Sequence, residues 1–284
     1  MLVSLFLGFG LFLSGLLAKQ CILDEVTNSL PLCLDENMYE RKNIYDTTSD
    51  ERQAFFDGFQ AVAQGPELQQ IVELVENKDI SHDDMDVFWL RALLHLFEKA
   101  MQAKVTNAKL PYWDSVRDYP WKADRPIYSY QFLGGDKQDT CWILTRFPKY
   151  KAMSMKEWDK TCIERNTEDM ESFLVGKRIV KLYMEYETFT EIHAKLVELW
   201  PKKVSGKWVP FHPKDPLFYV HMAFVDKLFT DWQNMKPINK KLARNPPDTL
   251  MQHFNVPIRQ VMDLNTRLCY SYKEAGKNIF YTDE

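Results

Sequence analysis

The strongest constraint on the fold of this sequence is helical periodicity, because long segments place their apolar residues along one stripe. Residues 86–104 are the first such segment, with apolar side chains recurring every three or four positions. The second lies within residues 172–200, and His193 falls on its stripe. Each segment predicts an amphipathic helix with one buried side. The stripe of the second segment consists of Leu182, Tyr186, Phe189, His193, Leu196 and Trp200.

A third helix is predicted to begin at Asp215-Pro216 and to continue to about residue 233. An acidic N-cap followed by a proline in the first turn is typical of a helix start. His221 lies on the flank of this stripe, whereas His95 lies off the stripe of the first helix and is expected to be exposed. The third stripe consists of Phe218, Met222, Val225, Phe229 and Trp232.

The remaining sequence completes a mainly α fold. Shorter helical patterns occur at about 49–64, 66–77 and 257–269, whereas residues 110–170 are aromatic and loop-rich, and strand signals are sparse. Helices with one apolar stripe bury it by packing against one another. We therefore expect a core helix bundle wrapped by long loops.

The first residues of the chain are typical of a secretory signal peptide. Residues 2–17 form a charge-free apolar run, and Ala18 is a small residue suited to cleavage. The run is short for a membrane span, so a signal anchor is the weaker alternative. We expect a secreted, extracellular protein without stable membrane insertion after cleavage. The predicted parts are a signal peptide at 1–18, an N-terminal segment at 19–37, one domain at 38–275 and a C-terminal tail at 276–284.

Charge and cysteine content restrict the partners and the compartment. The net charge is −4, so no global field attracts nucleic acid or anionic lipid, and any partner must be recognised by a local site. The five cysteines fit two disulfides and one remaining thiol in an oxidising compartment. The pairings closest in sequence are Cys21–Cys33 and Cys141–Cys162, but spacing alone does not determine the connectivity.

Four stretches carry short motifs in a fixed order from Arg41 to Tyr272. They are Phe88-Trp89-Leu90-Arg91 with Phe97-Glu98; Leu110-Pro111-Tyr112-Trp113-Asp114; Asp215-Pro216-Leu217-Phe218-Tyr219 with Asp226 and Trp232-Gln233; and Cys269-Tyr270-Ser271-Tyr272 with Arg41. In this order they resemble the tyrosinase family, whose members share a domain with molluscan haemocyanin units and with plant and fungal polyphenol oxidases. The resemblance implies a helical domain that holds two copper ions, each bound by three neutral imidazoles.

Apolar residues stand at several positions where the resemblance places copper ligands. Leu90, Phe189 and Met222 occupy places where the family has histidines. Buried hydrocarbon at these places stabilises a fold by ~1.5–3 kcal/mol per side chain, whereas uncoordinated imidazoles would need hydrogen-bond partners. We therefore expect that the copper pocket has become part of the core.

Three histidines remain as candidate metal ligands. His193 matches the later member of a histidine pair, and His82 matches an early first-copper ligand if the chain lacks one residue after it. His221 precedes the last ligand position by one residue, which turns its side chain by about 100° around the helix. Three such residues cannot complete two sites of three imidazoles each.

The resemblance and the missing ligands together predict a secreted, non-catalytic tyrosinase-like protein with a structural or binding role, and an extracellular partner or matrix. Two alternatives stay open. One is a residual copper-dependent phenol or catechol oxidase, and the other is a mononuclear copper binder that uses His193, His221 and Met222. Arg91 and Asp226, which adjoin lost ligand positions, are expected to form an ion pair between two helices.

Overall fold

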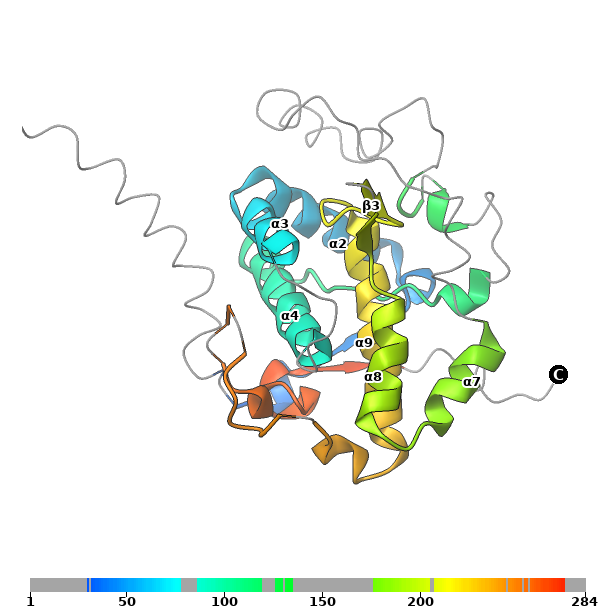
Figure 1. Ribbon diagram of the computed structural model, residues 1–284. Helices are drawn as coiled ribbons and strands as arrows, with labels where there is room; N and C mark the ends of the chain where they lie inside the picture. The colour runs from blue at the N-terminus through cyan, green and yellow to red at the C-terminus, as the bar shows by residue number, and fades with distance from the viewer. Residues whose placement is uncertain are drawn as a thin grey trace, which may run out of the picture.

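The computed structural model describes most of the helical domain. It covers residue 30 and residues 32–77, 86–118, 126–129, 131–134, 176–204, 207–243, 245–251, 253–254 and 256–273. Six α-helices occur in these ranges, and Figure 1 shows them arranged around α9. The mainly α bundle is confirmed, and the predicted signal peptide lies outside the described residues. The helices are α2 (Ser49–Gln64), α3 (Glu67–Asn77), α4 (Asp86–Lys104), α7 (Lys177–Glu185), α8 (Phe189–Glu198) and α9 (Pro216–Met235).

Helix α9 is the central element, with α4 and α2 on one side and α8 and α7 on the other (Figure 1). It begins where the sequence predicts, because the Asp215 side chain accepts a hydrogen bond from the backbone N–H of Leu217 and Pro216 fills the first turn. The burial of α9 is broader than the predicted stripe. Tyr219, Val220 and His221, which lie off that stripe, are also buried. A helix surrounded by other elements has no solvent-facing side along most of its length.

The prediction of one helix with one apolar stripe within residues 172–200 is wrong, because this region forms two helices. Helix α7 ends at Glu185 and α8 begins at Phe189, because Thr188 caps α8 in a reciprocal capping box with Glu191. The change of direction leaves Leu182 46% exposed. The segment predicted at 257–269 is not an α-helix either. It forms the 3₁₀ turn η7 (Ile258–Gln260) and the π-helical turn η8 (Leu264–Leu268).

Two short parallel strands join the ends of the described chain. Strand β1 (Tyr39–Arg41) pairs with β4 (Tyr270–Tyr272), in register from Tyr39 opposite Tyr270 to Arg41 opposite Tyr272. This pairing places Arg41 beside the Cys269-Tyr270-Ser271-Tyr272 motif, with which the resemblance groups it. A separate antiparallel pair is formed by β2 (Lys202–Val204) and β3 (Lys207–Val209).

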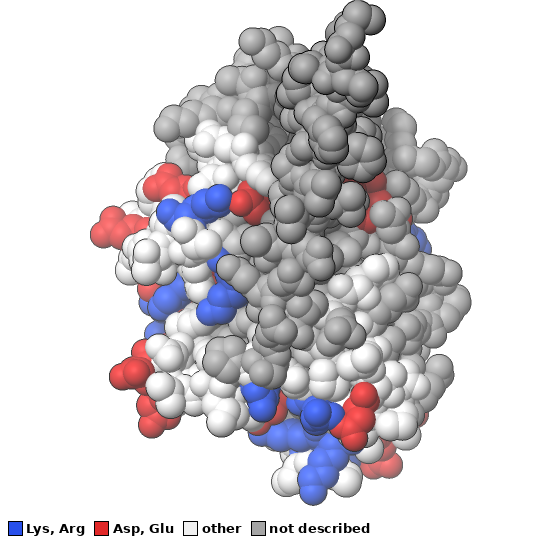
Figure 2. Space-filling view, turned by 90° about the vertical axis from the view of Figure 1, so that its left-hand side faces the viewer, with Lys and Arg blue, Asp and Glu red and all other residues white. Residues whose placement is uncertain are grey.

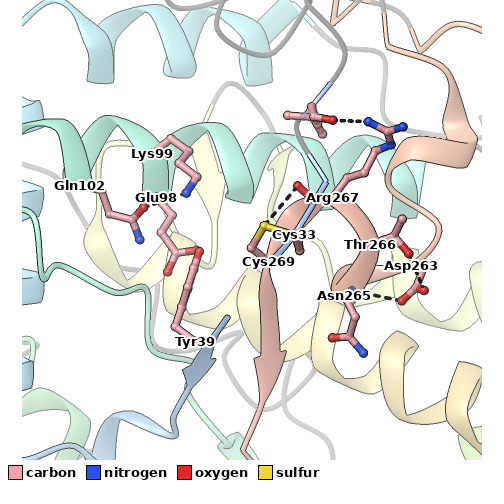
Figure 3. The surroundings of a disulfide bond; sticks show 11 residues. Cys33, Tyr39, Glu98, Lys99, Gln102, Asp263, Asn265, Thr266, Arg267 and Cys269 are labelled. Carbon is pink, nitrogen blue, oxygen red and sulfur yellow. Dashed lines mark hydrogen bonds between the residues drawn. A yellow bond between two sulfur atoms is a disulfide. The ribbon is translucent and has the colours of Figure 1, made fainter. Parts of the chain in front are cut away.

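A disulfide between Cys33 and Cys269 links the same two ends (Figure 3). Cys33 therefore does not pair with Cys21, its nearest cysteine in the sequence, and Cys21, Cys141 and Cys162 lie outside the described residues. Strand pairing provides the physical reason: the backbone N–H of Tyr39 donates to the carbonyl of Cys269, and that of Cys33 donates to the carbonyl of Thr266. These contacts bring the two cysteines together across a sequence separation of 236. None of the helices in the described ranges is long and apolar enough to cross a membrane.

The close approach of α2 and α4 leads to a testable prediction at Gly58. A Cβ atom added there would lie 2.8 Å from the Cβ of Ala108 and 3.1 Å from that of Met101. We expect Gly58→Ala to lower the free energy of unfolding by about 1–3 kcal/mol, although alanine itself favours the helix by about 1 kcal/mol. Urea unfolding measures the change. Ala108→Gly in the same chain should recover part of the loss, and a stabilised single variant would contradict the packing.

Candidate metal centre and the buried charge network

The three apolar residues at expected ligand positions lie in the core. Leu90 on α4 and Met222 on α9 are each 1% exposed, and Phe189 at the start of α8 is 6% exposed. The ring of Phe189 stacks on Phe88 with centroids 5.8 Å apart and meets Phe229 edge-on at 6.0 Å. Aromatic and aliphatic groups thus occupy the region where these helices meet.

His193 follows Phe189 by one turn of α8 and is partly buried. Its ring stacks on that of Phe189, with centroids 5.5 Å apart and an angle of 20° between the planes. The structure therefore places the surviving histidine beside an aromatic ring at the position of its expected fellow ligand. Such stacking orients an imidazole within an apolar cluster.

His221 is held by a backbone carbonyl. Its Nε2 lies 2.8 Å from the carbonyl oxygen of Leu199, the C-cap residue that follows α8. Because a carbonyl only accepts, Nε2 carries the proton. The ring also packs against Phe211 at 5.6 Å and Trp113 at 6.2 Å. Burial lowers the pKa of His221 to about 4, despite the opposing effect of this hydrogen bond. His221 is thus a neutral imidazole that ties α9 to the end of α8.

These side chains do not fit a pair of three-imidazole copper sites. His82 lies outside the described residues. Within the described ranges, no group of three or more His, Cys, Asp and Glu side chains is placed to hold a metal ion. The three apolar side chains cannot coordinate through nitrogen.

The prediction that His95 is exposed is wrong, because its exposed fraction is only 3%. It lies between Arg91 and Glu98 on α4, four residues after the first and three before the second, so all three share one side of the helix. Burial, followed by the positive charges of Lys99 and Arg41, lowers the pKa of His95 to about 3. The charged residues seven positions apart could have indicated this second buried side.

The two buried histidines predict acid lability. Both pKa values lie below the usual 6.5, so between pH 6.5 and about 4 the unfolded chain binds more protons and stability falls as pH falls. Each histidine should lower the free energy of unfolding by about 2 kcal/mol at pH 5. Asp114 opposes this effect, because burial raises the pKa of its carboxyl group to about 6 and favours the folded state in acid.

Thermal unfolding at pH 7 and pH 5 measures the net effect of His95, His221 and Asp114 on stability. We expect a lower melting temperature at pH 5 and a smaller difference in His221→Gln, whose amide can still donate to the Leu199 carbonyl. An identical pH dependence in the variant and the parent chain would contradict the assignment to His221.

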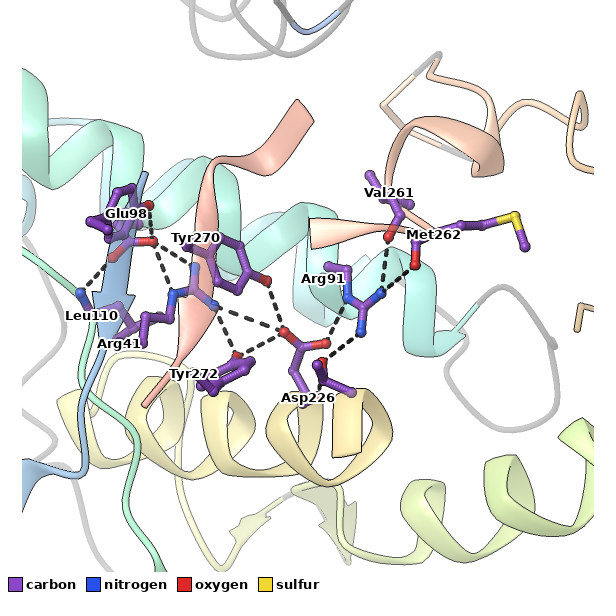
Figure 4. Close-up of polar contacts among 11 residues, drawn as sticks. Arg41, Arg91, Glu98, Leu110, Asp226, Val261, Met262, Tyr270 and Tyr272 are labelled. Carbon is purple, nitrogen blue, oxygen red and sulfur yellow. Dashed lines mark hydrogen bonds and ion pairs between the residues drawn. The ribbon is translucent and has the colours of Figure 1, made fainter. Parts of the chain in front are cut away.

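The predicted ion pair between α4 and α9 is confirmed and belongs to a larger buried network (Figure 4). Arg91 Nε donates to Asp226 Oδ1 at 2.8 Å, and both side chains are fully buried. Arg91 Nη1 also donates to the carbonyls of Val261 and Met262. Burial alone would lower the pKa of Arg91, but the Asp226 carboxylate raises it above its usual value.

The other oxygen of Asp226 receives two tyrosine hydroxyls from β4. Tyr270 and Tyr272 donate to Oδ2 at 2.8 and 2.7 Å. Burial raises the pKa values of both hydroxyls well above their usual range, so they remain protonated donors. Arg41 Nη1 lies 3.9 Å from the same oxygen. Asp226 therefore joins β1, β4 and α4 to the central helix.

Glu98 completes the network, a role that its motif alone did not indicate. Arg41 donates to its Oε2 through Nη2 at 2.6 Å and Nε at 3.0 Å, and Tyr39 donates to the same oxygen at 2.6 Å. The backbone N–H of Leu110 donates to Oε1 at 2.7 Å. Each buried charge thus has charged and hydrogen-bonded partners, as a low-dielectric interior requires.

Comparisons with known proteins agree with this architecture. A family model described as the common central domain of tyrosinase matches residues 81–235. The chain is 26% identical over 182 residues to a tyrosinase of Streptomyces antibioticus, covering 52% of this chain and 62% of that protein. It is 24% identical over 189 residues to the hemocyanin beta-C chain unit G of Helix pomatia, covering 62% of this chain and 43% of that protein.

Solved structures show the same fold. A polyphenol oxidase from Thermothelomyces thermophila superposes with a TM-score of 0.62 at 14% identity, covering 92% of this chain and 98% of that chain. A functional unit of octopus hemocyanin superposes with a TM-score of 0.52 at 15% identity, covering 83% and 68% respectively.

Proposed function

The chain belongs to the tyrosinase family, and from this premise we propose that it is a secreted, non-catalytic member whose copper pocket has been converted into core. Its role is then structural or in binding, with an extracellular partner or matrix. Copper is the cofactor of the tyrosinase family, and the proposed loss of the copper pocket concerns only this member of it.

The observation that carries the proposal is the joint burial of Leu90, Phe189 and Met222 at expected ligand positions. One apolar replacement could be tolerated beside a weakened metal site. Three replacements on three helices remove nitrogen donors from both coppers, and each buried side chain contributes about 1.5–3 kcal/mol to the folded state. The packing of Phe189 between Phe88 and Phe229 supports the same reading.

Two further observations support secretion. The disulfide between Cys33 and Cys269 is typical of an oxidising compartment, and the apolar run at residues 2–17 suits export. The mononuclear alternative stays open at His221, because the hydrogen bond of Nε2 to the Leu199 carbonyl leaves the Nδ1 lone pair for a metal ion.

Metal analysis of the purified protein after incubation with copper tests the proposal. We expect far less than one copper per chain and no oxidation of a catechol. Two coppers per chain with catechol oxidation would refute it. Oxidation that is lost in His193→Ala would instead establish the residual oxidase.

A chelator provides a second test that does not depend on activity. Because a ligand that binds only the folded state stabilises it by mass action, a resident copper would raise the melting temperature. We expect a copper chelator to leave the melting temperature unchanged. A clear decrease, reversed by added copper, would contradict the converted pocket.

A further inference from the structure

A basic segment follows the central helix, in contrast to the charge of the rest of the chain. The whole chain has a net charge of −4, and Figure 2 shows acidic and basic side chains mixed over the face that it presents. Between Asp231 and Asp248, however, the sequence contains no acidic residue. Its basic residues are Lys236, Lys240, Lys241 and Arg244. Positive charge is therefore concentrated locally in a protein that is acidic overall.

The structure places this segment at the lower end of α9 in Figure 1, where the 3₁₀ turn η6 (Asn239–Lys241) follows the helix. Asn239 is buried and its side-chain amide donates to the carbonyl of Trp232 at 2.9 Å, which fixes the turn against the helix. Met235 is 49% exposed and Ile238 is 58% exposed. We call Met235, Lys236, Ile238, Lys240 and Lys241 the basic-apolar tip.

The end of α7 lies beside this tip. Trp232 Nε1 donates to the carbonyl of Tyr186 at 2.8 Å, and Nζ of Lys236 lies 3.6 Å from Oε1 of Glu187. One turn before Tyr186, Leu182 is exposed, and Lys181 next to it is exposed as well. Apolar and basic side chains from two helices thus occur together at one end of the bundle.

Of the nearby carboxylates, Glu187 pairs with Lys236 of the tip, whereas Asp231 and Asp248 are engaged by cations outside it. Asp231 pairs with Lys227 at 2.5 Å, and Asp248 pairs with Arg259. Among the residues that the structure describes, neither Lys240 nor Lys241 forms an ion pair. These two ammonium groups are therefore available for an external anionic surface.

We propose that the basic-apolar tip docks the protein on an anionic phospholipid surface. Lysines near such a surface attract its headgroups, while Met235 and Ile238 enter the boundary between headgroups and acyl chains. Exposed apolar side chains within a few residues of exposed lysines suit this boundary better than they suit an acidic polysaccharide, which would use the charges and leave the apolar groups in water. The attachment is peripheral and needs no membrane-spanning helix.

Binding of the chain without its predicted signal peptide, residues 19–284, to phosphatidylcholine vesicles with and without phosphatidylserine tests the proposal. We expect binding only with phosphatidylserine, weakened by added salt. Since each lysine near the surface contributes about a fivefold factor, Lys240→Gln with Lys241→Gln should lower the partition coefficient about 30-fold. Ile238→Ser should lower it about tenfold, because part of its apolar side chain no longer enters the boundary.

The matched control is Lys104→Gln with Lys109→Gln. Arg91 contacts Asp226 and Phe97 contacts Tyr219, so α4 and α9 run antiparallel and Lys104, the last residue of α4, lies at the opposite end of the bundle. Lys109 lies away from the tip as well, with its Nζ 5.8 Å from the ring of Tyr39 on β1. The control removes the same charge and should bind like the parent chain. The parent chain and all variants begin at residue 19, after the predicted signal peptide, so the apolar run at 2–17 makes no contribution to vesicle binding.

Three outcomes would overturn the proposal. They are no binding to phosphatidylserine vesicles, an equal loss in the control, and lysine-dependent binding to heparin that is unchanged by Ile238→Ser and absent with vesicles. The last result would assign the tip to an acidic polysaccharide. None of these results depends on copper, so this inference and the proposed function can fail separately.

Discussion

Replacing Asp226 with asparagine is expected to lower the free energy of unfolding by about 3–5 kcal/mol. The carboxylate lies 2.8 Å from Arg91 and 3.9 Å from Arg41, and it accepts hydrogen bonds from Tyr270 and Tyr272. An amide of the same size keeps the volume but removes the charge. Two buried guanidinium groups would then share only Glu98 as a compensating carboxylate. Urea unfolding followed by far-ultraviolet circular dichroism measures the loss.

Asp57→Asn is the matched control for this charge. Asp57 lies on the exposed side of α2, where it accepts a hydrogen bond from Gln53. A change at such a position usually alters stability by less than about 0.5 kcal/mol. If Asp226→Asn were as mild as this control, the network would not stabilise the fold as the geometry indicates.

Removing the disulfide is expected to have a similarly large effect. Cys33 and Cys269 close a loop with a sequence separation of 236, and in the chain-entropy model such a bridge contributes about 5 kcal/mol. The double variant Cys33→Ser with Cys269→Ser should therefore unfold at a lower urea concentration. Serine at both positions avoids a new unpaired thiol.

Reductant distinguishes this bridge from any formed by the other cysteines. We expect reductant to destabilise the parent chain strongly and the double variant much less. A double variant as stable as the parent chain would show that strand pairing holds these ends without the bridge. Equal sensitivity of both chains to reductant would assign the stabilisation to another pair of cysteines.

Helices with local start signals were predictable from the sequence. Helix α2 spans Ser49–Gln64 and α4 spans Asp86–Lys104, both as predicted, and Asp215 begins α9. In α2, Thr48 accepts from the N–H of Glu51 and the Glu51 side chain accepts in return. Caps and apolar spacing act within a few residues, so they can be read without knowledge of the fold.

Predictions failed where a local pattern competed with another contact. The stripe from Leu182 to Trp200 looked continuous, but the Thr188 cap interrupts it. His95 looked exposed because only the apolar side of α4 was considered, whereas Arg91 and Glu98 form a second buried side. A single helix can bury two sides when other elements cover both.

The sequence by itself determined the helices that begin at local caps and the identity of the side chains at the expected ligand positions. Leucine, phenylalanine and methionine supply no imidazole at these positions in any conformation. Only the tertiary structure decided that Arg41 meets Glu98 across 57 residues, that Nε2 of His221 bonds the Leu199 carbonyl, and that Cys33 pairs with Cys269. These contacts depend on how helices and strands pack in space. The spacing of residues along the chain does not show which residues far apart in the sequence come into contact.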